Sequence, residues 1–272
     1  MLGEEYPVRV ACEVVDCARS SYYYQAKIQD ETELKRAIED VVAEWPRYGY
    51  RRVTRQLQRQ GWPVNHKRIQ RLMGEMKLLL KRKPRQKRTT NSNHSYGRYP
   101  NLLKNLTIVR PDQVWVADIT SIRLPQGMAY LAVIMDVFTR NIRGWHLGRG
   151  LDLSLTLTAL NHALKNGAPE IHHSDQGLQY AASDYVKLLQ KYDTLISMAE
   201  VGAAWQNGYA ERLIRTIKEE EVDLSDYQDY HHAYTQLRHF LEQRYPNQRI
   251  HSALDYLTPA EFEQLWQQDQ AV

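Results

Sequence analysis

An aspartate ends a short apolar run in the stretch IHHSDQGLQY, residues 171–180. Asp175 follows four residues with strand character and precedes Gly177, which favours a tight turn. A second isolated acidic residue, Asp118, stands in the apolar run VWVADIT, residues 114–120. Because a buried carboxylate without a partner costs free energy, Asp118 needs a cation or a hydrogen-bond donor. Two such carboxylates, one within a strand and one at the end of another, predict a site for a divalent metal ion.

A third carboxylate, Glu211, lies in WQNGYAERLIRTIKEE, in the first turns of a predicted helix that follows a glycine-containing loop. In this interpretation Asp118, Asp175 and Glu211 converge from two strands and one helix. Carboxylate oxygens suit Mg²⁺ or Mn²⁺, and two such ions roughly 4 Å apart activate an attacking oxygen and stabilise a leaving one at phosphorus. Acidic residues are common, so the spacing alone also fits three unrelated carboxylates.

The elements that would position these groups begin near residue 110. Three apolar runs in succession predict strands, and alternating helices and strands follow them. This order predicts an α/β fold, a mixed sheet flanked by helices, with the strand before Asp175 lying beside the strand that carries Asp118. The predicted strands are 113–124, 129–139, 142–148, 171–174 and 195–199, the predicted helices are 154–167, 182–192 and 207–221, and 222–272 forms a helical C-terminal extension.

A small all-α domain is predicted over residues 31–80. Helical periodicity covers 32–45, 51–61 and 65–78, and Asn65 stands where an N-cap belongs. Three short helices, the last one carrying several cations, suit a helix-turn-helix or winged-helix DNA-binding domain. Residues 1–30 form an N-terminal helical segment, which fits a further small helix-turn-helix element or a simple packing helix.

Positive charge is concentrated in one part of the chain. The net charge is only +4, yet the segment from Arg47 to Arg98 holds sixteen Lys and Arg against one acidic residue, Glu75. This density predicts a polyanionic partner, most often nucleic acid, although a solvated surface or a disordered basic tail has the same composition. Residues 81–105 are predicted to be a basic linker that follows a phosphate backbone. The expected DNA contacts here are Arg51, Arg52, Arg55, Lys67, Arg68, Arg71, Lys81, Arg82, Lys83, Arg85, Lys87 and Arg88.

Other classes of protein are disfavoured by the composition. No apolar run reaches the length of a membrane span, and the first residues lack a secretion signal, so no membrane partner is expected. Cys12 and Cys17 cannot build a disulfide framework. We therefore expect a cytoplasmic, nucleoid-associated protein.

Several blocks of this sequence resemble those of a known family. VWVADIT, HSDQGLQY and WQNGYAERLIRTIKEE are similar to the three blocks of the DDE transposases and retroviral-type integrases, with thirty-five residues between Asp175 and Glu211. PRYGYRRVTRQLQRQGWPVNHKRIQRLM, VIMDVFTRNIRGW and NQRIHSALDYLTPAEF are similar to further blocks of the bacterial insertion-sequence transposases of the IS-three type, specifically their OrfB product. The resemblance covers nearly the whole chain.

The resemblance implies an RNase H-like integrase catalytic core over residues 106–221. Asp118, Asp175 and Glu211 would be its catalytic residues and would bind two Mg²⁺ or Mn²⁺ ions. Family members cut at the ends of their element to free a 3′-OH, which then attacks another phosphodiester. The implied partners are the terminal inverted repeats and target DNA, further copies of the chain in a dimer or larger assembly on DNA, and the protein of the upstream reading frame, either fused or separate.

Further roles follow from the same resemblance. Arg215 and Lys218 lie four and seven residues after Glu211, on the same helical face, where integrases carry cations against the element-end DNA; two surface helix charges are the alternative. The chain also departs from the family pattern in the loop before Glu211. Many relatives have Asp-Asn-Ala where this chain has Gln206-Asn207-Gly208, and this loop is therefore expected to hold DNA differently. The other expected DNA contacts are His173, Gln179, Tyr180, Trp205 and Asn207.

Three polar groups close to these blocks are assigned other roles. His172 is expected to be structural, and His173 to form a hydrogen bond near the site or to face DNA. Asp136 is expected to cap or pair structurally and not to bind metal. The zinc-binding His and Cys module of retroviral integrases has no counterpart in the sequence.

Two hypotheses compete with strand transfer. Residues 31–100 could act as a sequence-specific DNA binder or transposition regulator beside an inactive core, although the presence of all three carboxylates argues against this. An RNase H-type nuclease would use the same metal pair with water as the attacking group.

Overall fold

A computed structural model describes residues 7–24, 30–80, 99–200 and 202–270 of the chain. The chain divides into two compact units, Met1–Asp40 and Val41–Val272. The first unit holds the two short N-terminal helices, α2 (Val8–Val14) and α3 (Arg19–Tyr22), with a turn between them as the sequence predicts. In the described residues no helix is both long and apolar enough to cross a membrane.

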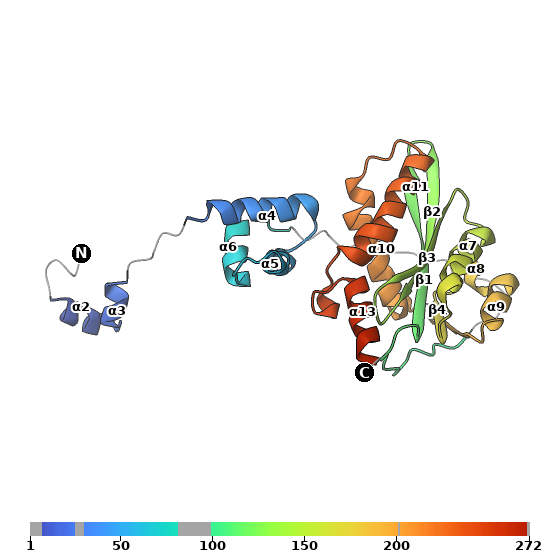
Figure 1. The fold of residues 1–272 in the computed structure, drawn as a ribbon, viewed down its shortest axis with the longest axis horizontal. Coiled ribbons are helices and arrows are strands. Elements are labelled where there is room, and N and C mark those ends of the chain that lie inside the picture. Colours follow the sequence, from blue (N-terminus) through green and yellow to red (C-terminus); the bar gives the residue numbers. More distant parts are fainter. Residues whose placement is uncertain (1–6, 25–29, 81–98, 201, 271–272) are drawn as a thin grey trace. The chain divides into compact units, whose positions relative to one another are not determined.

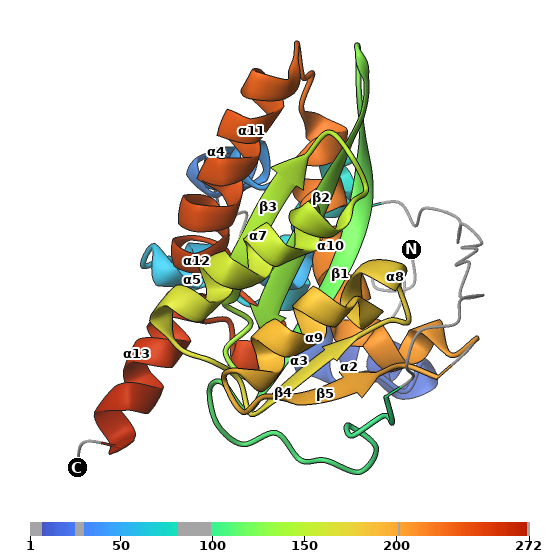
Figure 2. The ribbon, with the colours of Figure 1, turned by 90° about the vertical axis from the view of Figure 1, so that its right-hand side faces the viewer.

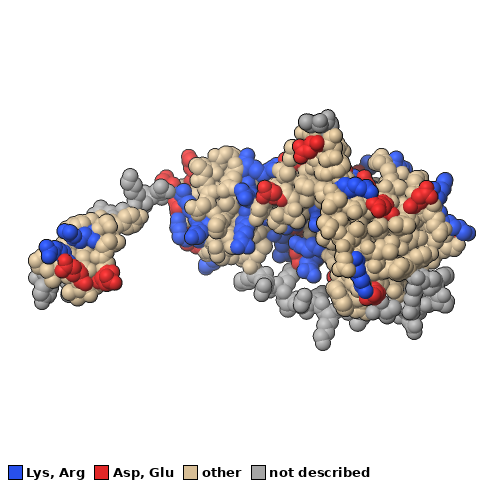
Figure 3. All heavy atoms as spheres, turned by 90° about the horizontal axis from the view of Figure 1, so that it is seen from below, with Lys and Arg blue, Asp and Glu red and all other residues tan. Residues whose placement is uncertain are grey.

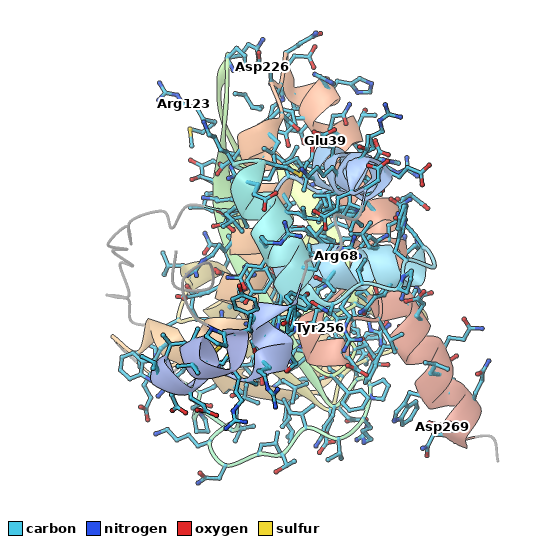
Figure 4. The ribbon with its side chains drawn as sticks, turned by 90° about the vertical axis from the view of Figure 1, so that its left-hand side faces the viewer. Glu39, Arg68, Arg123, Asp226, Tyr256 and Asp269 are labelled. Atoms are coloured by element: carbon cyan, nitrogen blue, oxygen red, sulfur yellow. The ribbon has the colours of Figure 1, made fainter. Side chains whose placement is uncertain are left out.

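Three helices follow where the periodicity predicts them: α4 (Thr32–Glu44), α5 (Tyr50–Arg59) and α6 (His66–Glu75). Asn65 caps α6, because its side chain accepts a hydrogen bond from the main-chain N–H of Arg68 at 2.9 Å. The spacing of apolar residues explains the packing, since Val53 and Leu57 of α5 and Ile69, Leu72 and Met73 of α6 are fully buried. Figure 4 marks Arg68 on α6.

A five-stranded mixed sheet forms the centre of the second unit, with the strand order β3-β2-β1-β4-β5 (Figure 1). β1 (Val114–Leu124) pairs antiparallel with β2 (Gly127–Asp136), which pairs antiparallel with β3 (Ile142–Gly148). On the other side, β1 pairs parallel with β4 (Ile171–Ser174), and β4 pairs parallel with β5 (Leu195–Met198). The predicted α/β fold and the predicted position of β4 beside β1 are confirmed.

Both faces of the sheet are covered by helices, as Figures 1 and 2 show. α7 (Leu153–Ala163), α8 (Leu178–Ala181) and α9 (Ser183–Gln190) pack on the face that carries Trp115 and Ala117. α10 (Gly208–Glu220) and α11 (Tyr230–His239) pack on the opposite face with Val114 and Val116. The first half of β1 is therefore buried on both sides, and only its outer half, up to Arg123 and Leu124, alternates between buried and exposed residues.

One glycine permits a close approach in this packing. A Cβ atom at Gly144 of β3 would lie 2.3 Å from the main-chain oxygen of Ala159 in α7, so any larger residue would force the helix away from the sheet.

The C-terminal extension is helical, as predicted, but it is broken into pieces. After α11 come a π-helical turn (Phe240–Arg244), the single turn α12 (Tyr245–Asn247) and α13 (Pro259–Gln270). Leu237, Phe240 and Tyr245 belong to the same core cluster as Val114 and Val116 of β1. The extension therefore completes the hydrophobic core beneath α10.

Candidate active site at the ends of two parallel strands

Asp118 and Asp175 occupy equivalent positions on two adjacent parallel strands. The register of β1 and β4 pairs Val114 with Ile171 and Val116 with His173. Two residues further along each chain the same register reaches Asp118, inside β1, and Asp175, the first residue after β4. Both aspartates are half-buried. The register of the parallel ladder thus leads to neighbouring positions for the first two predicted site residues, at the point where β4 ends.

Short local hydrogen bonds hold these carboxylates. Oδ1 of Asp118 accepts from the main-chain N–H of Ile119 at 2.8 Å. Oδ1 of Asp175 accepts from the main-chain N–H of Gly177 at 3.0 Å, which closes the tight turn that the sequence predicts after the strand. A Cβ atom at residue 177 would lie 3.0 Å from the same oxygen, so glycine leaves the space in which the carboxylate sits.

Glu211 lies in the first turn of α10, where the sequence predicts it, and is half-buried. The buried side chains of Ala210, Leu213 and Ile214 fix that turn on the sheet. The loop before the helix contacts β1 directly, because Nδ2 of Asn207 donates to the main-chain oxygen of Ala117 at 3.0 Å. Glu211 therefore belongs to a helix whose start is tied to the residue next to Asp118.

The donor set of carboxylates suits a hard divalent cation. Among the described residues, however, no group of three or more His, Cys, Asp or Glu side chains is arranged to hold a metal ion. The structure places Asp118 and Asp175 at neighbouring positions of two adjacent strands and Glu211 on the helix that packs beside them, but it does not gather all three around a single point.

The two histidines of β4 are interior residues. His172 is 1% exposed and shares a hydrogen bond of 3.0 Å with the hydroxyl of Tyr185, which confirms its structural role. His173 is fully buried, and its Nδ1 lies 2.8 Å from Oγ of Ser197 on β5. Burial lowers the pKa of His172 to about 3 and that of His173 to about 4, so both rings are neutral. The expected hydrogen bond of His173 is present. Its side chain is buried and so is not accessible for the expected contact with DNA.

Two more of the expected DNA contacts are also inside the fold. Tyr180 and Asn207 are each 3% exposed. Burial raises the pKa of Tyr180 well above its usual value, and the neighbouring charges of Asp118 and Asp175 add to this effect, which places the tyrosine close to both carboxylates. In the sequence, polar residues in a loop motif cannot be distinguished from surface residues. The packing of α8 and of the loop before α10 shows that Tyr180 and Asn207 are buried.

The remaining predicted contacts around the site stay accessible. Trp205, in the 3₁₀ helix Ala204–Asn207, is 75% exposed, and Arg215 is exposed on α10. Gln179 and Lys218 are half-buried, and Nε2 of Gln179 donates to the main-chain oxygen of Leu151 at 3.1 Å.

The basic residues of α5 and α6 divide into two groups. Lys67 and Arg71 of α6 are exposed, as is Arg51 of α5, whereas Arg68 is half-buried. Arg52 of α5 is instead used inside the molecule, where its side chain is 19% exposed and NH1 lies 3.4 Å from Oε1 of Glu220. The prediction of Arg52 as a DNA contact is therefore not supported by its position.

Arg55 is exposed on the same helix, and its guanidinium lies over the ring of Tyr256, 5.0 Å from the centroid. In the view of Figure 3, Lys and Arg lie on the surface of the helices that precede the core, and Asp and Glu are present among them as they are on the core. The expected contacts in the linker, Lys81 to Arg88, lie outside the described residues.

Asp136 at the end of β2 has the structural role that the sequence predicts. It is fully buried, and one of its oxygens accepts from the main-chain N–H of Thr139 at 2.8 Å and from its hydroxyl at 2.6 Å. The guanidinium of Arg143 lies 3.9 Å away. Burial raises the pKa of Asp136, against the opposing effects of Thr139 and Arg143.

Sequence reasoning missed a buried ion pair at the other end of α10. Glu220 accepts two hydrogen bonds from Arg249, at 2.6 and 2.7 Å, and the arginine is 1% exposed. The motif around Arg249 matches the C-terminal block of the family, but nothing in that block indicates a partner 29 residues away.

Comparison with known proteins gives a consistent assignment. Residues 29–88 match the model of an HTH-like domain, residues 109–204 match that of an integrase core domain, and residues 192–259 match a second model with the same description. The chain is 34% identical to the insertion element IS600 uncharacterized 31 kDa protein of Shigella sonnei, over 94% of this chain and 98% of that protein. It is 30% identical to the transposase for insertion sequence element IS629 of Shigella sonnei, over 97% of this chain and 94% of that protein.

The fold has a counterpart among solved structures. It is similar to a chain in the cryo-EM structure of the simian T-cell lymphotropic virus intasome in complex with PP2A regulatory subunit B56 gamma, with a TM-score of 0.50 and 14% identity over 83% of this chain and 74% of that chain. The matched domains define a protein that joins an HTH-like domain to an integrase core. The chain belongs to the IS-three type of bacterial insertion-sequence transposases.

Proposed function

We propose that the chain is a DDE transposase that cuts DNA at the ends of its insertion sequence and joins those ends to target DNA. The observation that carries this proposal is the parallel register that leads to Asp118 on β1 and Asp175 after β4. Carboxylates at adjacent positions of two neighbouring strands are well placed to share divalent cations, because neither side chain has to cross the sheet to reach the other.

Asp118, Asp175 and Glu211 are the residues that would hold Mg²⁺ or Mn²⁺. When bound, two such ions activate the attacking oxygen and stabilise the leaving one during displacement at phosphorus. Asp118 and Asp175 hold the sheet side of the site, and α10 supplies Glu211 from a separate element. The turn at Gly177 orients one oxygen of Asp175 by a hydrogen bond, which limits the rotation of that carboxylate.

DNA binding in this proposal uses the cations that the fold leaves accessible. Lys67 and Arg71 are exposed on α6, the second helix of a helix-turn-helix pair and the one that enters the major groove in such domains. Arg215 and Lys218 on α10 and Trp205 before it would contact DNA near the carboxylates. The basic linker would follow the backbone between these two surfaces.

The further partners belong to the same proposal. Joining two element ends needs a dimer or larger assembly on DNA, and the protein of the upstream reading frame would act with this chain, fused or separate. In this proposal the protein acts in the cytoplasm, at the nucleoid, where its DNA substrates are.

Strand transfer is tested with duplexes that carry the terminal inverted repeats of the element, a target plasmid and Mg²⁺. We expect the wild-type chain to give joined products and Asp175→Asn to give none while it still binds the repeat. Asp184→Asn removes an exposed carboxylate from the start of α9 and should behave like the wild type, so it controls for the loss of one negative charge.

The same assay separates the competing hypotheses. Binding without cleavage by either the wild type or Asp175→Asn would point to a regulator. Nicked DNA without joined products, lost in the variant, would point to a nuclease.

A further inference from the structure

Asn207 completes the hydrogen bonding of β1 where the parallel ladder ends. In that ladder the main-chain N–H of Ile171 donates to the oxygen of Gln113, so every second residue of β4 faces an oxygen of β1. Continued by four residues, this pattern would bring the oxygen of Ala117 opposite Asp175. The amide of Asn207 instead donates to that oxygen, at 3.0 Å. A side chain from the loop before α10 thus contacts β1 where β4 ends.

The position of Asn207 in its own helix supports the same conclusion. Asn207 immediately precedes α10, where asparagine commonly caps the helix with its side chain. Here the side-chain oxygen makes no cap hydrogen bond and is buried without a hydrogen-bond partner, while Nδ2 donates to the strand. Glu211 follows four residues later, which is about one helical turn. The bond therefore connects the turn that carries Glu211 with the main chain one residue before Asp118.

The neighbouring residue stabilises the loop in a different way. Oε1 of Gln206 accepts from Nδ2 of Asn101 and from the main-chain N–H of Glu200, both at 2.8 Å, and its Nε2 donates to the carboxylate of Glu200 at 2.9 Å. Gln206 thus closes the loop on itself and on the segment before β1. Of the pair, only Asn207 has its side chain bonded to the strand that carries Asp118.

We propose that Asn207 is a positioning residue, which sets the distance between Glu211 on α10 and Asp118 on β1 through its hydrogen bond to Ala117. This inference rests on the proposed function for its effect on strand transfer. Its structural part, the attachment of the first turn of α10 to β1, can be measured without any DNA. The role differs from the DNA contact that the motif suggests, because the side chain of Asn207 is 3% exposed.

The test compares Asn207→Ala and Asn207→Asp with the wild type. The alanine removes the donor, and the aspartate keeps the volume but places a carboxylate oxygen against the oxygen of Ala117. Asn161→Ala is the matched control, because the Nδ2 of Asn161 also donates to a main-chain oxygen, that of Leu157 at 2.8 Å, at an exposed position on α7. Amide hydrogen exchange, affinity for the repeat DNA and the maximal rate of strand transfer are measured for each variant.

We expect the amides at the start of α10 to exchange about tenfold faster or more in both Asn207 variants, with the amides of β1 and β2 as protected as in the wild type. The maximal rate of strand transfer should fall by about 100-fold, the scale of a small misplacement of a reacting group, with DNA affinity changed less than about twofold. The Asn161 variant should match the wild type throughout.

Unchanged exchange at the start of α10 in both variants would overturn the inference. So would a loss of DNA affinity with an unchanged maximal rate, because it would make Asn207 a DNA contact. If the wild type itself joins no DNA, the proposed function fails, and the exchange measurement still decides whether Asn207 attaches α10 to the strand. Asn207→Asp, which preserves the side-chain volume, provides the answer should the alanine variant fail to fold.

Discussion

The smallest feature that controls the site is the absence of a side chain at residue 177. The main-chain N–H of Gly177 donates to Oδ1 of Asp175, and an added Cβ would lie 3.0 Å from the same oxygen. The φ of −65° at Gly177 suits any residue, so the effect of a methyl group is a local displacement of the carboxylate and not strain in the backbone.

We therefore expect Gly177→Ala to melt within a few degrees of the wild type and to lose strand-transfer activity by about tenfold or more, because the misplaced carboxylate holds the reacting groups poorly. Initial rates at saturating DNA and thermal melting measure the two quantities. Gly49→Ala is the control, since a Cβ there would meet Leu80 at an ordinary 3.9 Å. Full activity in Gly177→Ala would show that the position of this oxygen is not critical.

A second prediction at this scale concerns His251. Burial lowers the pKa of His251 to about 2, and the charges of Arg249, Arg52, Arg140 and Arg212 add to the effect. The folded chain keeps this ring neutral, whereas the unfolded chain protonates it below about pH 6.5. The unfolded state therefore binds one more proton, and stability falls as the pH is lowered below 6.5.

The contribution should be about 1.4 kcal/mol per pH unit between pH 6 and 4, and His251→Gln should remove it. Urea unfolding at several pH values gives the slope of the unfolding free energy against pH, which does not depend on how much the substitution costs at neutral pH. His231→Gln, at an exposed position of α11, should leave the slope unchanged. Equal slopes in all three proteins would contradict the assignment.

The sequence identifies acidic residues by their surroundings better than it identifies neutral polar ones. Asp118, Asp175 and Asp136 are each conspicuous in apolar runs, and the distinction between site and structure is correct for Asp136 because Thr139 follows it at the spacing of a turn. His173, Tyr180 and Asn207 are expected to contact DNA, and all three are buried, although the alternative expectation of a hydrogen bond holds for His173. Whether they are buried depends on how α8 and the loop before α10 pack, which is a tertiary property that local spacing does not contain.

At the scale of elements, α10 is held at both ends by polar contacts. Asn207 bonds its start to β1, and Glu220 near its end accepts two hydrogen bonds from Arg249. Arg52 of α5 approaches the same carboxylate at 3.4 Å, and the main-chain N–H of Ile250 donates to the hydroxyl of Tyr48 at 3.0 Å. The helix that carries Glu211 is thus linked to α5 through the ion pair between Glu220 and Arg52.

Glu220→Gln should destabilise the protein by about 3–5 kcal/mol, because it leaves the guanidinium of Arg249 buried without its counter-charge. Arg110→Ala is the comparison, since it breaks a pair with Glu170 in which both side chains are about half exposed, and it should cost less than about 1 kcal/mol. Denaturant unfolding of the two variants measures both values. Equal small losses would mean that the buried pair adds little to stability.

Periodicity predicts most of these elements because each amphipathic helix and each alternating or continuous apolar strand shows its buried face in the sequence. α4, α5, α6 and α10 begin and end within a few residues of the predicted limits, and so do the five strands. The broken path of the C-terminal extension is not predicted. Phe240 and Leu241 of its π-helical turn and Tyr245 of the single-turn helix α12 are all buried in one core cluster, a tertiary arrangement that helical periodicity does not contain.

At the scale of the whole molecule, positive charge is segregated but only partly available. The sixteen Lys and Arg between residues 47 and 98 suggest a continuous basic surface. Arg52 is engaged with Glu220, Arg55 lies over Tyr256, and Arg59 pairs with Glu261 of α13. Much of the charge on α5 therefore serves contacts with α10 and the C-terminal segment. The exposed cations that remain are Arg51 of α5 and Lys67 and Arg71 of α6, and Arg71 also pairs with Glu75 at 2.7 Å.

The salt dependence of DNA binding tests this division. Each phosphate contact adds about 0.9 to the slope of log affinity against log salt, so Lys67→Gln, on the exposed face of α6, should lower the magnitude of that slope by about one. Lys165→Gln removes the same charge from an exposed position beyond α7 and should leave the slope unchanged. Fluorescence anisotropy with repeat DNA between 50 and 300 mM salt, about the range over which such binding weakens steeply, gives the slopes. An equal decrease in both variants would mean that DNA senses the net charge of the molecule and not a defined contact of α6, because a general field is weakened by either substitution.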